Sequence, residues 1–504
     1  MKIFSAEQIR QWDQYTIDKE PISSLALMER ASTVFVEWWI ERYPSPLPVV
    51  IFCGTGNNGG DGLAVARLLS ARSYSVTVFF CHIGQSTEDC EANYQALSAV
   101  SQVTVRELYT GDSLPDFDSD HLLIDALFGA GLNRPITGYW AELIDHINKS
   151  SGEISSIDIP SGMFLNQTSK NNVVIRAKNT LSFQSPKLAL LLAENYPYTQ
   201  NWSFRSIGLD ASFAKKQSSD YYFLTKSDIK SWIRVRGKFD HKGTHGHALL
   251  VAGSYGKIGA AVLAAKACLR SGVGLLSVHL PACGYSIMQA QVPEAMVQID
   301  KNHHFWTDSI NTATYKAIGL GCGIGQEETT KFALQDLIHK AECPLVLDAD
   351  ALNLLSQDAN KLQVLPHNTI ITPHPKEFQR LFGEAADDFQ RLDILKKRAT
   401  DLGIIIILKG AYTCIALPNG ICYFNSTGNP GMATGGSGDA LTGILTGLLA
   451  QGYTPDKAAL IGVFLHGLAG DIASTKESEY AMLPSDLIAH IGRAFMQIKS
   501  STKI

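Results

Sequence analysis

A glycine-rich segment near the C-terminus has the residue types for phosphoryl chemistry. The segment Gly435 to Gly438 precedes Asp439, and a helical pattern follows from Ala440 to Leu449. A helix N-terminus carries partial positive charge and free N–H groups, so glycines there favour a phosphate site. A carboxylate beside that site repels phosphate, but it can take a proton from a hydroxyl that receives a phosphoryl group. The segment predicts a base at Asp439, with an ordinary helix N-cap as the alternative.

A second glycine motif lies in the first quarter of the chain. Residues Val49 to Phe80 predict a strand, a glycine loop, a helix and a second strand, with GxGxxG running from Gly54 to Gly59. The second strand leads into Cys81 and His82 without the acidic residue that binds ribose, so we expect no ordinary dinucleotide site. The loop from Asn57 to Asp61 instead offers amides and a carboxylate that suit sugar hydroxyls, phosphate and a small cation.

Two more aspartates come near the ends of predicted strands. Asp125 lies in HLLIDALF, and Asp158 lies in ISSIDI. Because ligands of parallel α/β sheets bind beyond the carboxyl ends of the strands, both are expected to converge on the segment Asn57 to Asp61. The alternative is that each carboxylate merely caps a neighbouring loop. Three such strand ends in one domain favour a site.

Composition predicts a globular chain of at least two domains. The chain has 504 residues, 45% hydrophobic and 18% charged residues, and a net charge of −5. This length exceeds one ordinary core, and the negative charge argues against general nucleic-acid binding. Nine cysteines without a CxxC pair favour free thiols in a reducing compartment. With no signal core and no apolar run long enough to span a bilayer, we expect a soluble cytoplasmic protein without membrane association.

The second half repeats a pattern of strand, polar loop and helix, which predicts an α/β domain. His374 and Glu377 follow one predicted strand, and Lys409 follows another in a Lys-Gly turn where a nucleotide phosphate could bind. Taken alone, His374 between prolines is more typical of an exposed loop. The segment HKGTHGH, from His241 to His247, suggests a metal, but a flexible loop is favoured because no carboxylate or cysteine completes the set.

The first half resembles the epimerase domain of NAD(P)H-hydrate repair proteins. The resemblance rests on LMERA, GTGNNGGDGLAVAR, IDALFGAGL and IDIPSG, and it extends to about Asp210. It implies Asp158 as the acid/base that inverts C6 of the hydrated nicotinamide, and a K⁺ site at Asn58, Asp125 and Ser161. The implied hydrate contacts are Asn57, Asn58, Gly59, Gly60, Asp61, Gly129, Ala130, Gly131, Leu132, Asn133, Arg134, Pro135 and Asp158, with either Tyr139 or Trp140 completing the pocket.

The second half, from about Tyr221 onward, has a ribokinase-like pattern and resembles the NAD(P)H-hydrate dehydratase domain. Six motifs occur in order: VAGSYGKIGA, GLGCGIG, LDADALN, TPHPKE, LKGAYT and GNPGMATGGSGDALTG. The resemblance implies Asp439 as the base on the hydrate hydroxyl, with the Gly436 to Gly438 amides on the transferred phosphoryl group. Hydrate contacts are expected at Ala260, Gly323, His374 and Asp439, nucleotide contacts at Lys409, Gly410, Ala411, Tyr412, Thr413 and Gly438, and water-mediated Mg²⁺ binding at Glu377.

Together the resemblances imply an α/β protein with a Rossmann-like three-layer domain at residues 1–213 and a ribokinase-like domain at residues 221–504. The first would interconvert the R and S epimers of hydrated NADH and NADPH, called NADHX and NADPHX. The second would dehydrate the S form with ADP or ATP, and ADP is preferred because fused relatives mostly use it. A homo-oligomer is expected. Two rivals stay open: a small-molecule kinase of the ribokinase class, and a non-catalytic N-terminal binding or scaffolding module.

Overall fold

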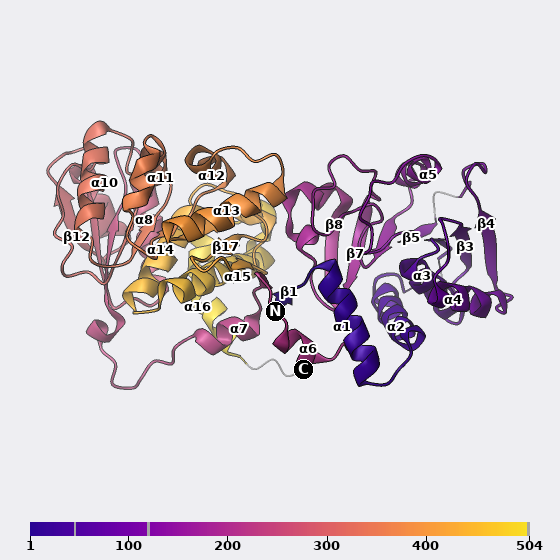
Figure 1. Cartoon of the computed structure of the whole chain (residues 1–504). Helices are drawn as coiled ribbons and strands as arrows, with labels where there is room; N and C mark the ends of the chain where they lie inside the picture. Colours follow the sequence, from indigo (N-terminus) through magenta and orange to yellow (C-terminus); the bar gives the residue numbers. More distant parts are fainter. Residues whose placement is uncertain (45–46, 118–120, 501–504) are drawn as a thin grey trace. The chain divides into compact units, whose positions relative to one another are not determined.

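The computed structural model describes residues 1–44, 47–117 and 121–500, and it divides into two compact units (Figure 1). One unit contains residues 2–219 and 387–389, and the other contains residue 1 with residues 220–386 and 390–504. Residues 501–504, which fall in the predicted second domain, lie outside the described residues. The segment from Asp210 to Tyr222, where the two predicted domains meet, contains helix α6 (Ala211–Lys216) and the start of strand β9 (Tyr221–Phe223).

The first unit is built on a wholly parallel sheet of seven strands in the order β4-β3-β2-β5-β6-β7-β8. Its strands are β2 (Val49–Cys53), β3 (Val76–Cys81), β4 (Val103–Leu108), β5 (Leu122–Ala126), β6 (Ile154–Ile157), β7 (Ala177–Phe183) and β8 (Thr199–Arg205). The chain begins with β1 (Lys2–Ile3), and the helices are α1 (Ala6–Lys19), α2 (Ser24–Arg42), α3 (Asn57–Ser70), α4 (Glu88–Ser98), α5 (Tyr139–Asn148) and α6.

Strand β2 shows why this sheet must be covered on both faces. Its five residues are all buried. Val49 and Ile51 enter the apolar core that α1 to α4 build on one face, whereas Val50 and Phe52 enter the core that α5 closes on the other. Side chains of a strand alternate between faces, and a run of apolar residues without polar positions therefore requires two cores. This is the three-layer arrangement that the sequence predicted.

The second unit has a mixed sheet in which β10 to β16 are parallel and β17 is antiparallel to both its neighbours. Its strands are β9, β10 (His247–Val251), β11 (Leu275–Pro281), β12 (Met296–Asp300), β13 (Ala317–Leu320), β14 (Leu345–Leu347), β15 (Ile370–Ile371), β16 (Ile405–Leu408), β17 (Cys414–Ala416) and β18 (Cys422–Phe424). The spatial order runs β9-β18-β17-β16-β15-β14-β13-β10-β11-β12.

The helices of the second unit are α7 (Lys226–Trp232), α8 (Ile258–Arg270), α9 (Tyr285–Gln291), α10 (Glu328–Lys340), α11 (Asp350–Ser356), α12 (Pro375–Phe382), α13 (Asp388–Leu402), α14 (Ser437–Ala450), α15 (Pro455–Ala481) and α16 (Pro484–Lys499). Side chains of α8, α14, α15 and α16 form one apolar core with the sheet. The expectation that no apolar run could span a bilayer was wrong, because α15 is long and apolar enough by composition. That apolar window is 78% buried, however, so α15 serves as a core helix.

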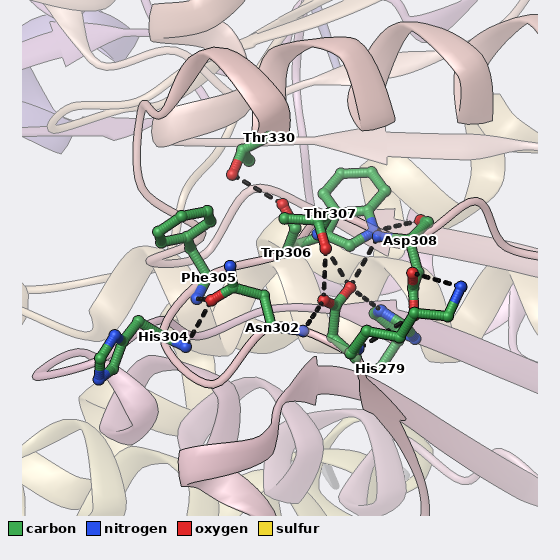
Figure 2. A network of polar contacts seen from close by, with 10 residues as sticks. His279, Asn302, His304, Phe305, Trp306, Thr307, Asp308 and Thr330 are labelled. Carbon is green, nitrogen blue, oxygen red and sulfur yellow. Dashed lines mark hydrogen bonds and ion pairs between the residues drawn. The ribbon is translucent and has the colours of Figure 1, made fainter.

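A buried carboxylate organises the chain after β12 (Figure 2). Asp300 Oδ1 accepts hydrogen bonds from the Asn302 amide at 2.8 Å and the Thr307 hydroxyl at 2.8 Å. Its Oδ2 accepts from the amides of Thr307 at 2.9 Å and Asp308 at 2.8 Å, and from His279 Nε2 at 3.0 Å. Although burial alone raises the pKa of a carboxyl, these bonds hold the pKa of Asp300 below its usual value.

The loop that follows Asp300 contacts the glycine-containing loop between β10 and α8. The Tyr255 amide donates to the His304 carbonyl at 2.7 Å, and their rings meet edge to face at 4.9 Å. On the other side, the Thr330 hydroxyl of α10 donates to the Trp306 carbonyl at 2.9 Å. The loop therefore joins α10 to the segment between β10 and α8, which leads to Ala260.

We predict that Asp300→Asn lowers the free energy of unfolding of the second unit by about 2–4 kcal/mol, because one amide N–H₂ must then face buried N–H donors. Amide hydrogen exchange of the buried strands β10 and β13 in the full chain, followed over a range of urea concentrations, measures this for the second unit alone. A carboxyl with a depressed pKa stabilises the fold at higher pH, and this contribution is lost as pH falls through the folded-state pKa. The difference between variant and wild type should therefore shrink below about pH 4.

The matched control is Asp308→Asn, because this carboxylate receives only the bonds of Lys301 at a half-buried position. We expect it to change stability by less than about 1 kcal/mol. Equal losses from both variants would contradict the role given to Asp300.

Candidate active sites in the two units

The turn between β2 and α3 is tighter than the sequence predicted. Helix α3 begins at Asn57 with Gly56 as its N-cap, so the segment Asn57 to Asp61 forms its first turns and is not a loop. A Cβ on Gly54 would lie 2.1 Å from the Leu127 carbonyl, and one on Gly59 would lie 1.8 Å from the Gly54 carbonyl. Nothing lies within 4 Å of a Cβ on Gly56. Two of the three glycines are therefore needed for packing, and Gly56 faces open space.

The three predicted K⁺ ligands meet around one backbone carbonyl. Asn58 Nδ2 donates to the Phe128 carbonyl at 3.1 Å, and Ser161 Oγ lies 3.1 Å from the same oxygen. The Ser161 hydroxyl and amide donate to Asp125, whose side chain is buried and also accepts from the Ser156 hydroxyl at 2.8 Å. The Phe128 carbonyl could not be predicted as part of this site, because residue types do not indicate which backbone carbonyls line a site.

This donor set fits a small hard cation. It offers oxygens from a carboxylate, a hydroxyl, an amide side chain and a carbonyl, which alkali and alkaline-earth ions prefer. It contains a single formal negative charge, which suits a monovalent ion. Burial raises the pKa of Asp125 despite its bonds to Ser161 and Ser156, and a bound cation would offset that cost of burial.

Asp158 follows β6 and is held by a buried lysine. Its backbone has φ of +63°, a conformation that non-glycine residues rarely adopt. Lys187 Nζ donates to Asp158 Oδ1 at 3.0 Å, and the Ser182 hydroxyl and Phe183 amide donate to the same oxygen at 3.2 and 2.9 Å. All the bonds recorded for this carboxylate among the described residues go to Oδ1, so Oδ2 is available to a ligand.

Two further carboxyl groups belong to this cluster. Asp61 is half-buried in the first turns of α3, and its pKa is raised by burial, by Asp158 and by Asp13, against the opposing hydrogen bond of the Ser32 hydroxyl. Asp13, on α1, has its pKa raised to about 7 by burial and by Asp158, against the opposing effect of Lys187. The sequence argument found Asp61 but missed both Asp13 and Lys187, which lie far from the glycine motif in the chain.

The remaining predicted hydrate contacts lie after β5. Gly129 packs against Asn58, since a Cβ there would lie 3.1 Å from the Asn58 Cβ. Gly131 and the positions from Asn133 to Pro135 are exposed. Tyr139 and Trp140 begin α5 with ring centroids 4.9 Å apart, and the buried Tyr139 hydroxyl has no hydrogen-bond partner among the described residues. Both aromatic residues remain candidates.

In the second unit, Asp439 lies in the first turn of α14. The N-cap is Gly436, with φ of +98°, so the alternative that Asp439 is an N-cap was wrong. His466 of the neighbouring α15 lies against this turn, with Nε2 2.9 Å from the Ser437 carbonyl. Burial lowers the pKa of His466 to about 4, so the imidazole is neutral and donates this bond. The Ser437 amide donates to the Thr434 carbonyl at 3.4 Å, and amides in the first turn of a helix can in general bind an anion.

A buried ion pair lies beside Asp439. Lys409 Nζ, at the end of β16, is 2.7 Å from Asp348 Oδ1 at the end of β14 and 4.0 Å from Glu377 Oε2 of α12. Thr442 of α14 donates to Asp348 Oδ2 at 3.0 Å. Burial opposes both charges, but each ion favours the other, so the pKa of Asp348 is lowered and that of Lys409 is raised.

This pair and its surroundings set the charge of Asp439. Burial and the negative charge of Asp348 raise the pKa of Asp439 to about 6, while the Cys322 thiol and Lys409 oppose the rise. A carboxylate with this pKa is mostly ionised at neutral pH and is more basic than an ordinary aspartate, which suits a general base. The sequence had not pointed to Cys322 or Asp348 as neighbours of Asp439.

The predicted hydrate residues of this unit fall near the same strand ends. A Cβ on Gly323 would lie 3.2 Å from the Ala260 Cβ, so the loop after β13 touches the start of α8. His374 is the N-cap of α12: its Nδ1 accepts from the Lys376 and Glu377 amides at 3.1 and 3.3 Å. The Glu377 carboxylate returns a bond to the His374 amide at 2.9 Å. This capping box places His374 next to the cluster of Lys409.

The residues of the predicted nucleotide-binding turn differ in their exposure to solvent. Lys409 points into the buried cluster, whereas Gly410 and Ala411 are exposed. The Thr413 hydroxyl closes the turn by donating to the Gly410 carbonyl at 2.9 Å. A Cβ on Gly438 would lie 3.4 Å from Lys409 Nζ, so the start of α14 adjoins the turn. The role of Lys409 as a phosphate ligand stays a prediction.

No metal cluster forms at the predicted histidine run. Lys242–His245 forms a short 3₁₀ turn, and β10 begins at His247. Within the described residues no group of three His, Cys, Asp or Glu side chains is placed to hold a metal. This search does not bear on the oxygen site of Asp125, which has a single carboxylate.

Known proteins match both units of the chain in order. Residues 24–189 match the family described as YjeF-related protein N-terminus, and residues 248–493 match the family described as NAD(P)H-hydrate dehydratase. The bifunctional NAD(P)H-hydrate repair enzyme Nnr of Moorella thermoacetica is 34% identical, covering 97% of this chain and 95% of that protein. The chain belongs to the family of bifunctional NAD(P)H-hydrate repair enzymes. The Escherichia coli member is 32% identical over 97% of this chain and 93% of its own length.

Solved structures resemble the second unit. The ADP/ATP-dependent NAD(P)H-hydrate dehydratase from Bacillus subtilis, co-crystallised with ATP and Mg²⁺, has a TM-score of 0.50 and 34% identity. It covers 55% of this chain and 98% of its own length. A ribokinase-like superfamily protein from Enterococcus faecalis has a TM-score of 0.51 and 28% identity over 56% of this chain and 99% of its own length. The ribokinase-like fold predicted for the second half is therefore confirmed.

We predict that Gly59→Ala strongly impairs the first unit, because its methyl group would overlap the Gly54 carbonyl. Steric overlap with backbone costs a buried position several kcal/mol, on the order of 3 kcal/mol or more. The variant should unfold at a lower temperature in a thermal scan of the full chain.

Gly56→Ala is the matched control, because its added methyl group meets open space at a φ of −86°. We expect it to keep wild-type thermal stability to within about 1 kcal/mol. If both variants are equally stable, the packing role of the third glycine is refuted.

Proposed function

We propose that this protein repairs hydrated NADH and NADPH in two steps. Its first unit epimerises the R and S hydrates, and its second unit dehydrates the S form at the expense of ADP or ATP. The family membership of the whole chain supports both activities. The observation that carries the proposal is that Asp158 is paired with the buried Lys187 in the first unit, whereas Asp439 lies beside the Lys409–Asp348 pair in the second.

In the second unit, Asp439 takes the proton of the hydrate hydroxyl as that oxygen attacks the terminal phosphoryl group of the nucleotide. The amides from Gly436 to Gly438 stabilise the charge on the transferred phosphoryl group. Phosphate then leaves with the electron pair of the C6–O bond, and C5 loses a proton to restore the ring double bond. Hydroxide is a poor leaving group and phosphate a good one, which explains a kinase-like fold in a lyase.

The ligand contacts follow from the same assignment. The hydrate lies against Ala260, Gly323 and His374, and the adenine nucleotide lies on the turn from Lys409 to Thr413 and on Gly438. The Bacillus subtilis relative was crystallised with ATP and Mg²⁺, and this supports a nucleotide-bound Mg²⁺. Glu377, at the edge of the cluster, would hold Mg²⁺ through water. ADP remains our preferred donor.

In the first unit, Asp158 acts as the acid/base that inverts C6 of the hydrate. The first turns of α3, with Asn57, Asn58, Gly59, Gly60 and Asp61, and the loop from Gly129 to Pro135 surround the ligand. Asn58, Asp125, Ser161 and the Phe128 carbonyl would hold K⁺. When bound, the ion would favour the ionised form of Asp125 and would hold the first turn of α3 in place through Asn58.

The cytoplasmic location and the homo-oligomeric state of the protein are also part of the proposal. All nine cysteines are free, which suits the cytoplasm. Strand β12 is an edge strand of its sheet, with Met296 45% and Ile299 50% exposed, and such an edge is compatible with a homo-oligomer. Its small-molecule partners are NADHX, NADPHX and an adenine nucleotide.

The two activities should be separable by single substitutions. Purified protein is mixed with both epimers of hydrated NADH, ADP or ATP, Mg²⁺ and K⁺, and the restored NADH is followed by its absorbance. Asp439→Asn should lower dehydration at least about 100-fold and spare epimer exchange, because general-base catalysis is worth about 10²–10⁴ in rate. Asp158→Asn should slow exchange alone, so that only the S fraction is recovered rapidly.

Each alternative function gives a different result in the same assay. A small-molecule kinase would leave the hydrates unchanged with either nucleotide. A non-catalytic first unit would allow the wild-type protein to recover only the S fraction, beyond slow spontaneous exchange. Normal dehydration by Asp439→Asn would remove the proposed base.

The cation site makes a prediction of its own. Replacing K⁺ with tetramethylammonium should lower the epimerisation rate, because the oxygens around Phe128 are too enclosed for a large organic cation. Dehydration of pure S hydrate in the same solutions serves as the internal control. Epimerisation rates that are equal in the two cations would argue against the K⁺ assignment.

A further inference from the structure

The sheet of the first unit has the strand order of dinucleotide-binding folds. Counted along the chain from β2, the order β4-β3-β2-β5-β6-β7 reads 3-2-1-4-5-6, and it reverses between β2 and β5. Sheets of this order bind one nucleotide on each side of the reversal, beyond the carboxyl ends of the strands. Asp158 follows β6, which places the nicotinamide half of the substrate on the side of β5 and β6. The adenosine half is then expected over β3 and β4.

The spacing of the strands is consistent with a ligand of this length. Neighbouring strands lie about 4.8 Å apart, and three spacings separate β6 from β3, so the ends of these two strands are about 14 Å apart. The first turns of α3 follow β2, which lies between them. A hydrated dinucleotide with its nicotinamide at Asp158 would therefore cross the start of α3 with its diphosphate and reach β3 with its adenosine half.

The carboxyl ends of β3 and β4 carry a stacked pair of rings. His82 follows β3 and Tyr109 follows β4, and their ring centroids are 4.2 Å apart with an angle of 4° between the planes. The His82 amide donates to the Leu108 carbonyl at 2.9 Å, which continues the pairing of the two strands to this point. Tyr109 is 51% exposed although His82 covers one face of its ring. The stack thus offers an aromatic surface to a ligand.

Polar contacts hold the stack in place. One carboxylate oxygen of Glu107, in β4, accepts from His82 Nε2, and the other accepts from the Tyr94 hydroxyl of α4. The Tyr109 amide donates to Asp112 Oδ2 at 2.7 Å. A ring that is oriented before a ligand arrives loses little freedom on binding, and this favours affinity.

The segment after His82 contacts the glycine turn of the predicted site. The Thr55 hydroxyl donates to the Ile83 carbonyl, and the Thr87 amide donates to the Thr55 carbonyl at 3.0 Å. Leu132, in the loop predicted to contact the hydrate, packs against the same apolar core as Ile83. The residues from His82 to Thr87 therefore connect the stack to the turn that leads into α3.

We propose that the His82–Tyr109 stack binds the adenine ring of the hydrated dinucleotide in the epimerase site. This inference rests on the function proposed above. Aromatic side chains bind bases by stacking on their faces. His82 also occupies the position after the second strand where ordinary dinucleotide sites have a carboxylate that accepts from the ribose. When its Nε2–H donates to Glu107, Nδ1 of a neutral imidazole can accept from a ribose hydroxyl in the same way.

Tyr109→Leu in the full chain is the test. The R and S hydrates of NADH are separated by chromatography, and their exchange is followed without added nucleotide. KM should rise about 5- to 100-fold, because the stacking of one base on one aromatic ring contributes about this factor to binding. The kcat should stay within about twofold, since the adenine ring is remote from the reacting carbon. Tyr109→Phe keeps the ring and should keep the wild-type KM.

A shortened substrate identifies the half of the ligand that the stack contacts. Hydrated reduced nicotinamide mononucleotide lacks the adenosine half, so Tyr109→Leu should exchange its epimers with the wild-type KM and kcat. A loss as large with this substrate as with hydrated NADH would show that the substitution disturbs the nicotinamide site or the fold, and it would overturn the inference.

Tyr196→Leu is the matched control. Tyr196 is 66% exposed and lies in a short 3₁₀ helix (Ala193–Tyr198) directly before β8, at the amino ends of the strands. Its loss should leave exchange of hydrated NADH unchanged. Dehydration of S hydrate by the second unit of the same molecules should be unchanged in all variants, and amide hydrogen exchange of the buried strand β2 reports whether the first unit is folded.

The other outcomes also decide the question. A wild-type KM for hydrated NADH in Tyr109→Leu would refute the adenine subsite and leave the proposed function standing. Failure of the wild-type protein to exchange the epimers would refute the proposed epimerase itself. A KM in Tyr109→Phe as high as in Tyr109→Leu would refute stacking, because the ring is still present. Equal rises in Tyr109→Leu and Tyr196→Leu would show that the effect does not come from the stack.

Discussion

Each unit depends on an ion pair, largely shielded from water, between a lysine and an aspartate at the end of a parallel strand. Lys187 holds Asp158 in the first unit, and Lys409 holds Asp348 in the second. Removing a charge from water costs several kcal/mol, so either ion without its partner would be strongly destabilising. The pair is therefore tolerated only where the sheet brings both strand ends together. The position of the ion pair and the position of the site are set by the same sheet topology.

The ion pairs also influence the pKa values of neighbouring carboxyl groups. A fixed negative charge nearby raises the pKa of a neighbouring carboxyl, and a fixed lysine limits the rise. Burial raises the pKa of Asp439 to about 6, with Asp348 adding to the rise and Lys409 opposing it. Burial likewise raises the pKa of Asp13 to about 7, with Asp158 adding to the rise and Lys187 opposing it. The two units perform different reactions with one electrostatic arrangement.

Local patterns in the sequence predicted the elements and the glycine motifs well. The strand, glycine turn and helix predicted from Val49 to Phe80 are present as β2, α3 and β3, because alternating apolar runs and glycines are local signals. The extent of α3 and α14 was misjudged at the N-terminus, since glycines can be helical when neighbouring backbone packs closely, as at Gly59. What could not be predicted is contact between distant segments. Asp13 and Lys187 are far from Asp158 in the chain, and no spacing rule connects them.

The second unit completes its apolar core with its last three helices. One face of its sheet is covered by α8 together with α14, α15 and α16, which span residues 437–499. During synthesis, the strands β10 to β16 leave the ribosome before those helices exist. Their apolar face must then remain uncovered, or be shielded by chaperones, until translation is almost complete. A chain that terminates shortly before Ser437 would lose α14 with Asp439 and a large share of the core, and we expect it to be degraded instead of accumulating as a partial enzyme.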